Sequence, residues 1–338
     1  MPNFGANLRV EPALNHMLTH SDYLTIIEQA LKDLRLPERP AGLYEPIRYA
    51  LECGGKRLRP ALTLAACDAF GPDAEAALSQ ALAVEMFHNF TLLHDDVMDH
   101  ADMRRGRPTV HTRWDDRTAI LSGDAMLSIA YDLVVSDCPG PVVAQRAMTL
   151  FHRTAMEVYE GQQYDMDFES RADVSVEEYM EMIRLKTSVL LGCACEMGAI
   201  VGGASDESCR AMYGFGEQLG LAFQLQDDYL DTYGDPIVFG KEIGGDILNE
   251  KKTWLLITAM AEAPEAVELA LAAGSEGPGA KIEAVRGVYD RLDLPRRCHE
   301  LIDGYVESAI RCLDRAALTP AARDFFAGIA DRSRTRQH

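Results

Sequence analysis

Helical spacing of apolar residues is the dominant pattern along this chain, and the strict alternation typical of strands is nearly absent. The helical segments are rich in Ala, Leu, Met and Glu, which favour helix. The pattern predicts helices at residues 21–35, 41–53, 58–70, 73–99, 118–136, 141–169, 175–202, 206–232, 251–273, 281–290, 295–316 and 319–334. The expected fold class is therefore all-α.

The breaks between these segments are short and carry turn-forming residues. They lie at Pro37 to Pro40, Gly54-Gly55, Gly71-Pro72, Cys138 to Pro141, Gly202-Gly203 and Gly274 to Gly279. None resembles an interdomain linker. The sequence predicts an N-terminal tail, residues 1–20, followed by one helical domain of ten or more helices over residues 21–334, which segments 73–99 and 206–232 are long enough to cross.

Composition narrows the function. The 338 residues are 47% hydrophobic, which is enough for a sizeable core, and their formal net charge is -20. So acidic a chain is not expected to bind nucleic acid, because phosphate backbones require basic surfaces. If its ligand is itself an anion, the protein must recruit metal ions and local basic residues.

Eight cysteines without a Cys-x-x-Cys pair indicate free thiols rather than disulfides or a zinc site. The N-terminus lacks the basic and apolar blocks of a signal peptide. The most apolar stretches are interrupted by charges such as Asp124 and Glu196. These features predict a cytoplasmic protein without a membrane span.

Two carboxylate clusters of identical spacing lie in helical stretches, Asp95-Asp96-Val97-Met98-Asp99 and Asp227-Asp228-Tyr229-Leu230-Asp231. Helix residues four apart project from one face, so the outer carboxylates of each cluster repel unless a cation lies between them. Oxygen ligands favour Mg²⁺, which commonly bridges carboxylates to phosphate. A single cluster would be read as a solvated acidic face, but the repetition and the apolar neighbours favour a metal and diphosphate site.

Three basic segments accompany the clusters. Gly54-Gly55-Lys56-Arg57-Leu58-Arg59-Pro60 precedes the first cluster, Arg104-Arg105 follows it, and Lys241 and Lys251 follow the second. Each alone could be a basic surface loop. Together with two metal clusters they imply two anionic groups, since Arg and Lys side chains donate to phosphate oxygens.

With these motifs in this order, the chain resembles the trans-isoprenyl diphosphate synthases, the polyprenyl synthetase family, from Gly54 to Thr253. Further matching elements are His88, Gly123-Asp124, Gly161-Gln162, Lys186-Thr187, Phe223 to Gln226 and Gly240-Lys241. The resemblance implies an all-α bundle around a central cavity, usually a homodimer. It also implies head-to-tail condensation of isopentenyl diphosphate with an allylic diphosphate, with Mg²⁺ as the metal and three ions as the expected number.

The resemblance assigns roles position by position. Asp95, Asp99 and Asp227 would be the main Mg²⁺ ligands, supported directly or through water by Asp96, Asp228 and Asp231, with Asp231 also counted as a metal ligand. Isopentenyl diphosphate would be held by Lys56, Arg59, His88 and Arg105, and the allylic diphosphate by Arg104, Lys186, Lys241 and Lys251. The backbone carbonyl of Thr187 and the side chain of Gln224 would lie near the cationic carbon.

The implied reaction is ionisation of the allylic C–O bond, attack by the alkene of isopentenyl diphosphate and loss of a proton, without a protein nucleophile. The residues expected to carry it are Asp95, Asp96, Asp99, Arg104, Lys186, Thr187, Gln224, Asp227, Asp228 and Lys241. Thr187, Gln224 and His88 could instead be hydrogen-bonded interior residues. His94 could be structural, and Gln162 and Asp165 could belong to a polar helix face.

Product length is a separate inference. In this family the tail grows along a hydrophobic tunnel whose floor lies on the helix before the first aspartates. Phe90, Thr91 and Phe87 precede Asp95 by five, four and eight residues. An aromatic residue five positions upstream resembles the short-chain synthases and favours a C15 product, with C20 next, although many bacterial farnesyl enzymes have four residues rather than two inside the first cluster. Core packing is the alternative for both Phe residues.

Two other functional classes are weighed. A class I terpene cyclase also ionises allylic diphosphates, but it needs no second diphosphate site, and the basic residues and the second Asp-Asp-x-x-Asp motif disfavour it. A noncatalytic regulatory subunit of a prenyl synthase would be expected to lack some of these aspartates or lysines, and none is missing.

Overall fold

The computed structural model describes residues 17–71, 73–234 and 243–334. The predicted all-α class is confirmed, because these residues form a helical bundle whose only strands are the paired two-residue segments β1 (Met103–Arg104) and β2 (Arg107–Pro108). Of the predicted N-terminal tail, residues 1–16 lie outside the described part, and the first helix begins at His20.

The longer helices agree closely with the segments predicted from the sequence. They are α1 (His20–Asp33), α2 (Ala41–Glu52), α3 (Leu58–Phe70), α4 (Leu78–Met98), α6 (Asp116–Val135), α7 (Pro141–Glu169), α8 (Val176–Ile183), α9 (Val189–Val201), α10 (Asp206–Tyr233), α13 (Trp254–Glu262), α14 (Pro264–Ala272), α15 (Pro278–Arg291), α16 (Leu294–Leu313) and α17 (Pro320–Arg334). Short turns are η1 (Ala74–Ala77), α5 (Val110–Arg113), α12 (Gly245–Leu248) and η3 (Ala273–Glu276).

Three predicted helices are not uniform. Segment 73–99 begins with the 3-10 turn η1 (Ala74–Ala77), and the α-helix α4 starts only at Leu78. Segment 251–273 is divided, because Ala263 takes the non-helical φ of -147° between α13 and α14. A residue before proline is pushed out of the α region by the proline ring, and Pro264 follows. Segment 175–202 contains a π-helical stretch, η2 (Arg184–Ser188), between α8 and α9.

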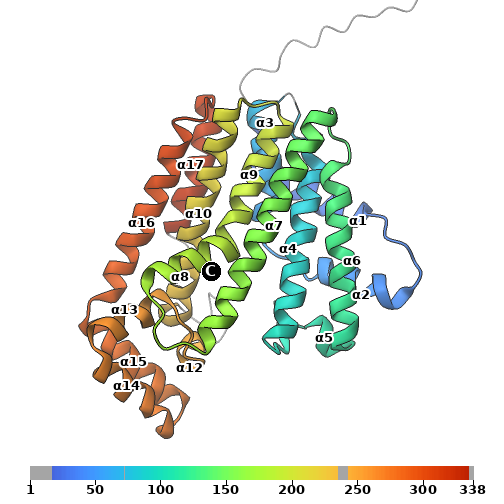
Figure 1. The fold of residues 1–338 in the computed structure, drawn as a ribbon. Coiled ribbons are helices and arrows are strands. Elements are labelled where there is room, and N and C mark those ends of the chain that lie inside the picture. Colours follow the sequence, from blue (N-terminus) through green and yellow to red (C-terminus); the bar gives the residue numbers. More distant parts are fainter. Residues whose placement is uncertain (1–16, 72, 235–242, 335–338) are drawn as a thin grey trace, which may run out of the picture.

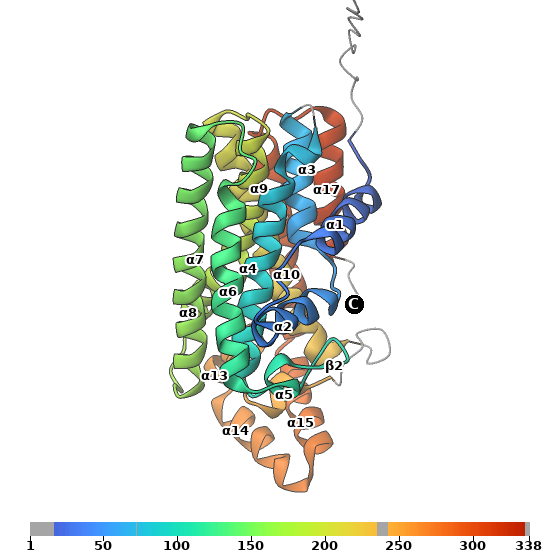
Figure 2. The same ribbon diagram turned by 90° about the vertical axis from the view of Figure 1, so that its right-hand side faces the viewer.

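Helix α9 lies at the centre of the bundle and packs against α3, α7 and α10. Glu196 is its only side chain that is not fully buried, as expected for a helix that is apolar on all sides. Around it, α4 packs against α3 and α6, and α10 packs against α16. Figures 1 and 2 show these long helices nearly upright, with α14 and α15 extending from one end of the bundle.

The arrangement brings both aspartate clusters to the same end of the bundle. Helices α4, α7 and α10 run in the same direction in Figure 1, and both clusters lie near the C-terminal ends of their helices. Local capping supports these elements: the hydroxyl of Ser175 accepts from the N–H of Glu178 while the Glu178 carboxylate accepts from the N–H of Ser175, a capping box that starts α8.

Candidate active site

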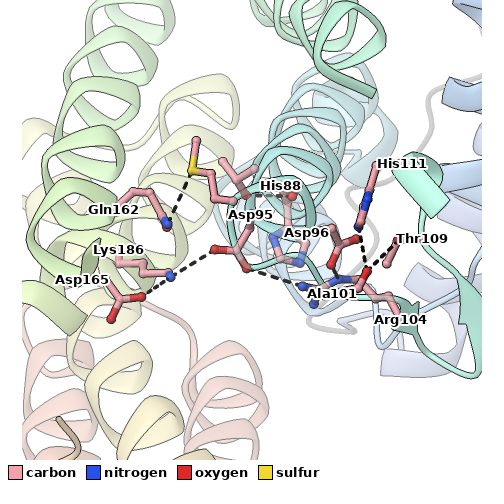
Figure 3. A network of polar contacts seen from close by, with 12 residues as sticks. His88, Asp95, Asp96, Ala101, Arg104, Thr109, His111, Gln162, Asp165 and Lys186 are labelled. Carbon is pink, nitrogen blue, oxygen red and sulfur yellow. Dashed lines mark hydrogen bonds and ion pairs between the residues drawn. The ribbon is translucent and has the colours of Figure 1, made fainter. Parts of the chain in front are cut away.

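The first aspartate cluster presents its carboxylates in two directions, because neighbouring helix residues do not share a face. The Asp95 carboxylate lies toward α7 and η2, whereas Asp96 lies toward the loop after α4 (Figure 3). Asp96 is 5% exposed, and its Oδ1 accepts from Nε of Arg104 at 2.6 Å. Burial raises the pKa of Asp96, and the Arg104 guanidinium opposes that rise. Asp96 therefore orients Arg104, which also reaches Asp95 at 3.4 Å.

The second cluster, on α10, also divides its carboxylates. Asp228 is buried, and its two oxygens accept from the hydroxyl of Tyr179 at 2.5 Å and from Nε2 of Gln224 at 2.9 Å. Burial raises the pKa of Asp228 to about 6. Asp231 accepts from the backbone N–H of Asp246 at 2.8 Å, which ties the end of α10 to α12. Asp227 is half-buried on the same helix.

Lys186 connects elements on opposite sides of the site. Its Nζ donates to Asp165 of α7 at 2.6 Å and to Asp95 of α4 at 3.2 Å (Figure 3). Lys186 lies in the π-helical stretch, and such stretches often occur at functional sites. Gly161 of α7 permits this stretch to approach, because a Cβ at position 161 would lie 2.3 Å from the backbone nitrogen of Lys186.

A chain of hydrogen bonds runs from the π-helical stretch to α8. The Thr187 hydroxyl donates to Oε1 of Gln224 at 3.0 Å, and Gln224 in turn donates to Asp228. Tyr179 completes the chain by donating to Asp228. Sequence reasoning missed Tyr179, although its position two helical turns before Lys186 could have placed it on the same face.

Arg59 and His88 are brought together, with Nη1 of Arg59 3.3 Å from Nε2 of His88. Burial, followed by the positive charge of Arg59, lowers the pKa of His88 well below its usual value, so the ring is neutral. Burial lowers the pKa of Arg59 to about 10. Arg105 donates to the carbonyl of Gly54, and Lys56 is exposed on the same loop. Gly55 has no side chain that would collide with the Arg105 guanidinium.

Arg57 is a second residue to which sequence reasoning gave no role of its own. Its side chain is 2% exposed and binds Glu85 of α4 at 2.6 Å, Glu28 of α1 at 2.9 Å and the carbonyl of Leu51 at 2.6 Å. Two carboxylates on other helices thus fix the start of α3, which carries Arg59, and the loop before it, which carries Lys56. The sequence feature that could have identified Arg57 is its position between Lys56 and Arg59 in a basic motif.

Lys251, just before α13, lies among carboxylates from several elements. Lys251 is exposed; the protein around it partly desolvates its ammonium, but Asp246, Asp165, Asp228 and Asp95 together raise the pKa of Lys251. The lysine is therefore charged and is within electrostatic range of Asp95 of the first cluster and Asp228 of the second. Lys241, which was predicted to contact the allylic diphosphate, lies outside the described residues.

The remaining candidates have identifiable surroundings. Nε2 of His94 lies 3.0 Å from the carbonyl oxygen of Ile120, and its ring packs against Gly123. These contacts join α4 to α6. Asp165 binds Lys186, whereas Nε2 of Gln162 lies 3.8 Å from the sulfur of Met98. Phe87 and Phe90 are buried on α4, and the Thr91 hydroxyl donates to the carbonyl of His88 at 2.8 Å.

The donor set fits magnesium. The cluster side chains are carboxylates, the hard oxygen ligands that Mg²⁺ prefers, and Asp95 and Asp99 stand one helical turn apart. Among the described residues no group of three or more His, Cys, Asp or Glu side chains encloses an ion alone. Mg²⁺ is usually held by one or two carboxylates together with water and substrate phosphates rather than by a protein cage.

Comparison with known proteins gives the family. The polyprenyl synthetase family model matches residues 40–291. The chain belongs to the polyprenyl synthetase family. It is 37% identical over 320 residues to a geranylgeranyl pyrophosphate synthase of Geoglobus acetivorans, covering 94% of this chain and 98% of that protein. It is 43% identical over 233 residues to a geranylgeranyl diphosphate synthase of Methanosarcina mazei, covering 69% and 72%.

Solved structures of the polyprenyl synthetase family agree with this fold. A crystal structure of a geranylgeranyl pyrophosphate synthase superposes with a TM-score of 0.90 at 42% identity, covering 95% of this chain and all 100% of that chain. The protein is thus a short-chain trans-isoprenyl diphosphate synthase, a prenyltransferase. Neither a terpene cyclase nor a noncatalytic subunit is favoured by these relatives.

Proposed function

We propose that this polyprenyl synthetase condenses isopentenyl diphosphate with allylic diphosphates and releases a C20 product, geranylgeranyl diphosphate. The observation that carries the proposal is Lys186 held between Asp95 and Asp165, with Lys251 among the carboxylates of both clusters. Positive and negative groups so close together suit a diphosphate accompanied by metal ions.

The choice of C20 over C15 rests on the relatives and on the first cluster. The spacing of Phe90 alone favoured C15 with C20 next. The two relatives described above are named geranylgeranyl synthases, and the first cluster has two residues, not four, between Asp96 and Asp99. These observations support C20.

In the proposed reaction, positive side chains hold both substrates. Lys186, Arg104 and Lys251 bind the allylic diphosphate and stabilise the charge that develops on its bridging oxygen as the C–O bond breaks. Arg59, with Lys56, His88 and Arg105, holds isopentenyl diphosphate beside it, so the alkene is aligned for attack. Because Gln224 donates to Asp228, its Oε1 faces Thr187, and the two residues offer oxygen dipoles to the cation.

Metal ions belong to this proposal. Asp95, Asp99, Asp227 and Asp231 would hold magnesium, which when bound supplies positive charge to the departing diphosphate. Three ions remain the expected number. Asp96 and Asp228 act through Arg104 and Gln224, which they orient.

A homodimer is also proposed, with the exposed apolar side of α6 as part of the shared face. In the described part of the chain, α6 is the one helix that is long and apolar enough to cross a membrane by length and composition. It packs with one stripe on α4, yet Ile120 and Leu121 are 46% and 60% exposed on its other side. A second copy of the chain would cover them. Location in the cytoplasm remains a proposal from the sequence.

The test of the dimer is light scattering of Leu121→Glu. The variant is expected to be monomeric, while Leu269→Glu, at a 76% exposed position on α14, keeps the mass of the parent. A parent protein that is monomeric throughout would overturn the dimer.

The test of the activity is product chromatography after incubation with isopentenyl diphosphate, Mg²⁺ and C5, C10 or C15 allylic diphosphate. C20 should be the main product from each starter, and EDTA should abolish turnover. Release of C15 as the final product would replace the assignment with a farnesyl synthase. Hydrocarbon formed from an allylic diphosphate alone would indicate a cyclase.

A further inference from the structure

Two arginines in the segment after α4 have a tyrosine ring, rather than a carboxylate, as their partner. Over the ring of Tyr49 on α2, Cζ of Arg107 lies 4.3 Å and Cζ of Arg113 lies 4.4 Å from the ring centroid. The ion pairs among the described residues include Arg104 but neither of these two arginines. Because a guanidinium group is attracted to the electron-rich face of an aromatic ring, Tyr49 takes the place of a counter-ion for both.

The same tyrosine is joined to the hairpin of β1 and β2 by hydrogen bonds. Tyr49 is 6% exposed, and its hydroxyl donates to the carbonyl of Pro108 in β2 at 2.7 Å. Nη1 of Arg107 donates to the carbonyl of Glu52 at 3.2 Å, at the C-terminal end of α2, where the helix dipole favours a cation. Strand β2 is therefore fixed to α2 by the ring, by the hydroxyl and by the end of the helix.

A cavity of about 30 Å³ lies between α2, α4 and this hairpin. Its lining includes Tyr49, Cys53, Leu92, Arg104 and Val110. Protein interiors are otherwise close-packed, and that packing holds neighbouring elements in place. Since the cavity interrupts the packing beneath the hairpin, the position of the hairpin depends on its contacts with α2.

The turn of the hairpin holds Arg105 in a backbone conformation that few side chains adopt. Arg105 and Gly106 have φ of 52° and 74°, and Arg104 pairs with Arg107 across the two strands. Two-residue turns in which both φ values are positive favour Asn-Gly, Asp-Gly or Gly-Gly. The strands on either side must therefore hold the arginine in this turn, and an anchor on Arg107 sets the position of both Arg104 and Arg105.

We propose that Tyr49 is a positioning residue for the binding of both diphosphates. Its ring retains the guanidinium groups of Arg107 and Arg113, two cations that would otherwise compete for the diphosphates. The anchored hairpin presents Arg104 to the allylic diphosphate and Arg105 to isopentenyl diphosphate. The inference rests on the proposed function, which assigns those two contacts, and adds a residue that had no role in it.

The experiment measures KM and kcat with both diphosphates for Tyr49→Leu, Tyr49→Phe and the parent protein. Tyr49→Leu removes the ring, so KM for isopentenyl diphosphate and KM for the allylic diphosphate should rise together, by about 3- to 30-fold. The kcat of the folded enzyme should change less, because the catalytic groups remain. Tyr49→Phe retains the ring and should recover most of the affinity.

The matched control is Tyr213→Leu, which removes a tyrosine ring from another pair of this kind. Cζ of Arg153 lies 5.2 Å from the centroid of this half-buried ring. Tyr213 precedes Asp227 by 14 residues, about 21 Å along α10. Both KM values of Tyr213→Leu should therefore equal those of the parent.

A double-mutant cycle tests whether Tyr49 acts through Arg107. Arg107→Met should also raise both KM values, and Tyr49→Leu/Arg107→Met should lose less than the product of the two single losses, because each single change already breaks the same contact. Calorimetric titration with inorganic pyrophosphate and Mg²⁺ should give the same order of affinities without turnover.

Parent-like KM values in folded Tyr49→Leu, or single losses that multiply in the double variant, would overturn the inference. If Tyr49→Leu does not fold, Arg107→Met and Arg113→Met take its place, since they remove the cations and leave the buried ring, and parent-like KM values in both would overturn it equally. A parent protein that binds pyrophosphate but forms no prenyl product would overturn the proposed function instead, and the pyrophosphate affinities would then decide the inference.

Discussion

The Nζ of Lys186 lies 3.2 Å from Oδ1 of Asp95, although 91 residues separate them in the chain. The ammonium also binds Asp165 at 2.6 Å, so one cation joins α4, α7 and the π-helical stretch (Figure 3). This contact links the first aspartate cluster to the segment that carries Thr187.

Lys186→Met is expected to lower kcat/KM for the allylic diphosphate by about 10- to 100-fold, because a hydrogen bond to a charged group contributes roughly 1.5–3 kcal/mol. Steady-state kinetics at fixed isopentenyl diphosphate measures the loss. Lys186→Arg retains the charge and should lose less. Equal losses in both variants would mean that the charge of Lys186 is not what the substrate uses.

Arg57→Met is expected to destabilise the fold by about 3–5 kcal/mol, because it leaves the carboxylate of Glu85, 3% exposed, buried without its main cation. Urea unfolding measures this loss. The double variant Arg57→Met/Glu85→Met should recover much of it. Arg296→Met, which breaks exposed pairs with Asp293 and Glu300, should cost less than about 1 kcal/mol. A small effect of Arg57→Met alone would contradict the anchoring role.

Gly161→Ala is expected to reduce both stability and activity, since its Cβ would lie 2.3 Å from the backbone nitrogen of Lys186. Overpacking of this kind typically costs about 1–3 kcal/mol, and the displaced π-helical stretch would misplace Lys186. Gly304→Ala is the control, because a Cβ there has nothing within 4 Å and should stabilise α16 by up to about 1 kcal/mol. Thermal unfolding and turnover of both variants give the answer, and an active, stable Gly161→Ala would refute the close approach.

Acid should weaken the fold through His88. Burial and the positive charge of Arg59 lower the pKa of His88 in the folded chain. Below about pH 6.5, His88 is therefore protonated in the unfolded chain while it is still neutral in the folded chain. The contribution of His88 is therefore present at neutral pH and is lost as the pH falls through 6.5. The free energy of unfolding of His88→Gln should decline less between pH 7 and pH 5 than that of the parent.

The control for this pH dependence is His100→Asn. His100 is exposed and has a φ of 51°, a conformation that Asn tolerates. The free energy of unfolding of His100→Asn should decline between pH 7 and pH 5 as much as that of the parent. If His88→Gln declines as steeply as His100→Asn, His88 is not the group responsible.

Much of the local structure was readable from the sequence because helices depend on neighbouring residues. The bounds of α3, α7 and α10 follow from apolar spacing, capping residues and glycine or proline breaks. The π-helical stretch at Arg184–Ser188 was not readable, because its residues have ordinary helical composition and the extra residue is accommodated by the approach of Gly161.

The sequence by itself determined the all-α class, the positions of most helices and the two aspartate clusters with their basic segments, since all of these depend on local spacing and residue type. Only the tertiary structure decided that Asp95 faces Lys186 while Asp96 holds Arg104, and that Tyr179 and Arg57 support the site. These relationships join distant segments, and the packing of whole helices, which no local pattern encodes, sets them.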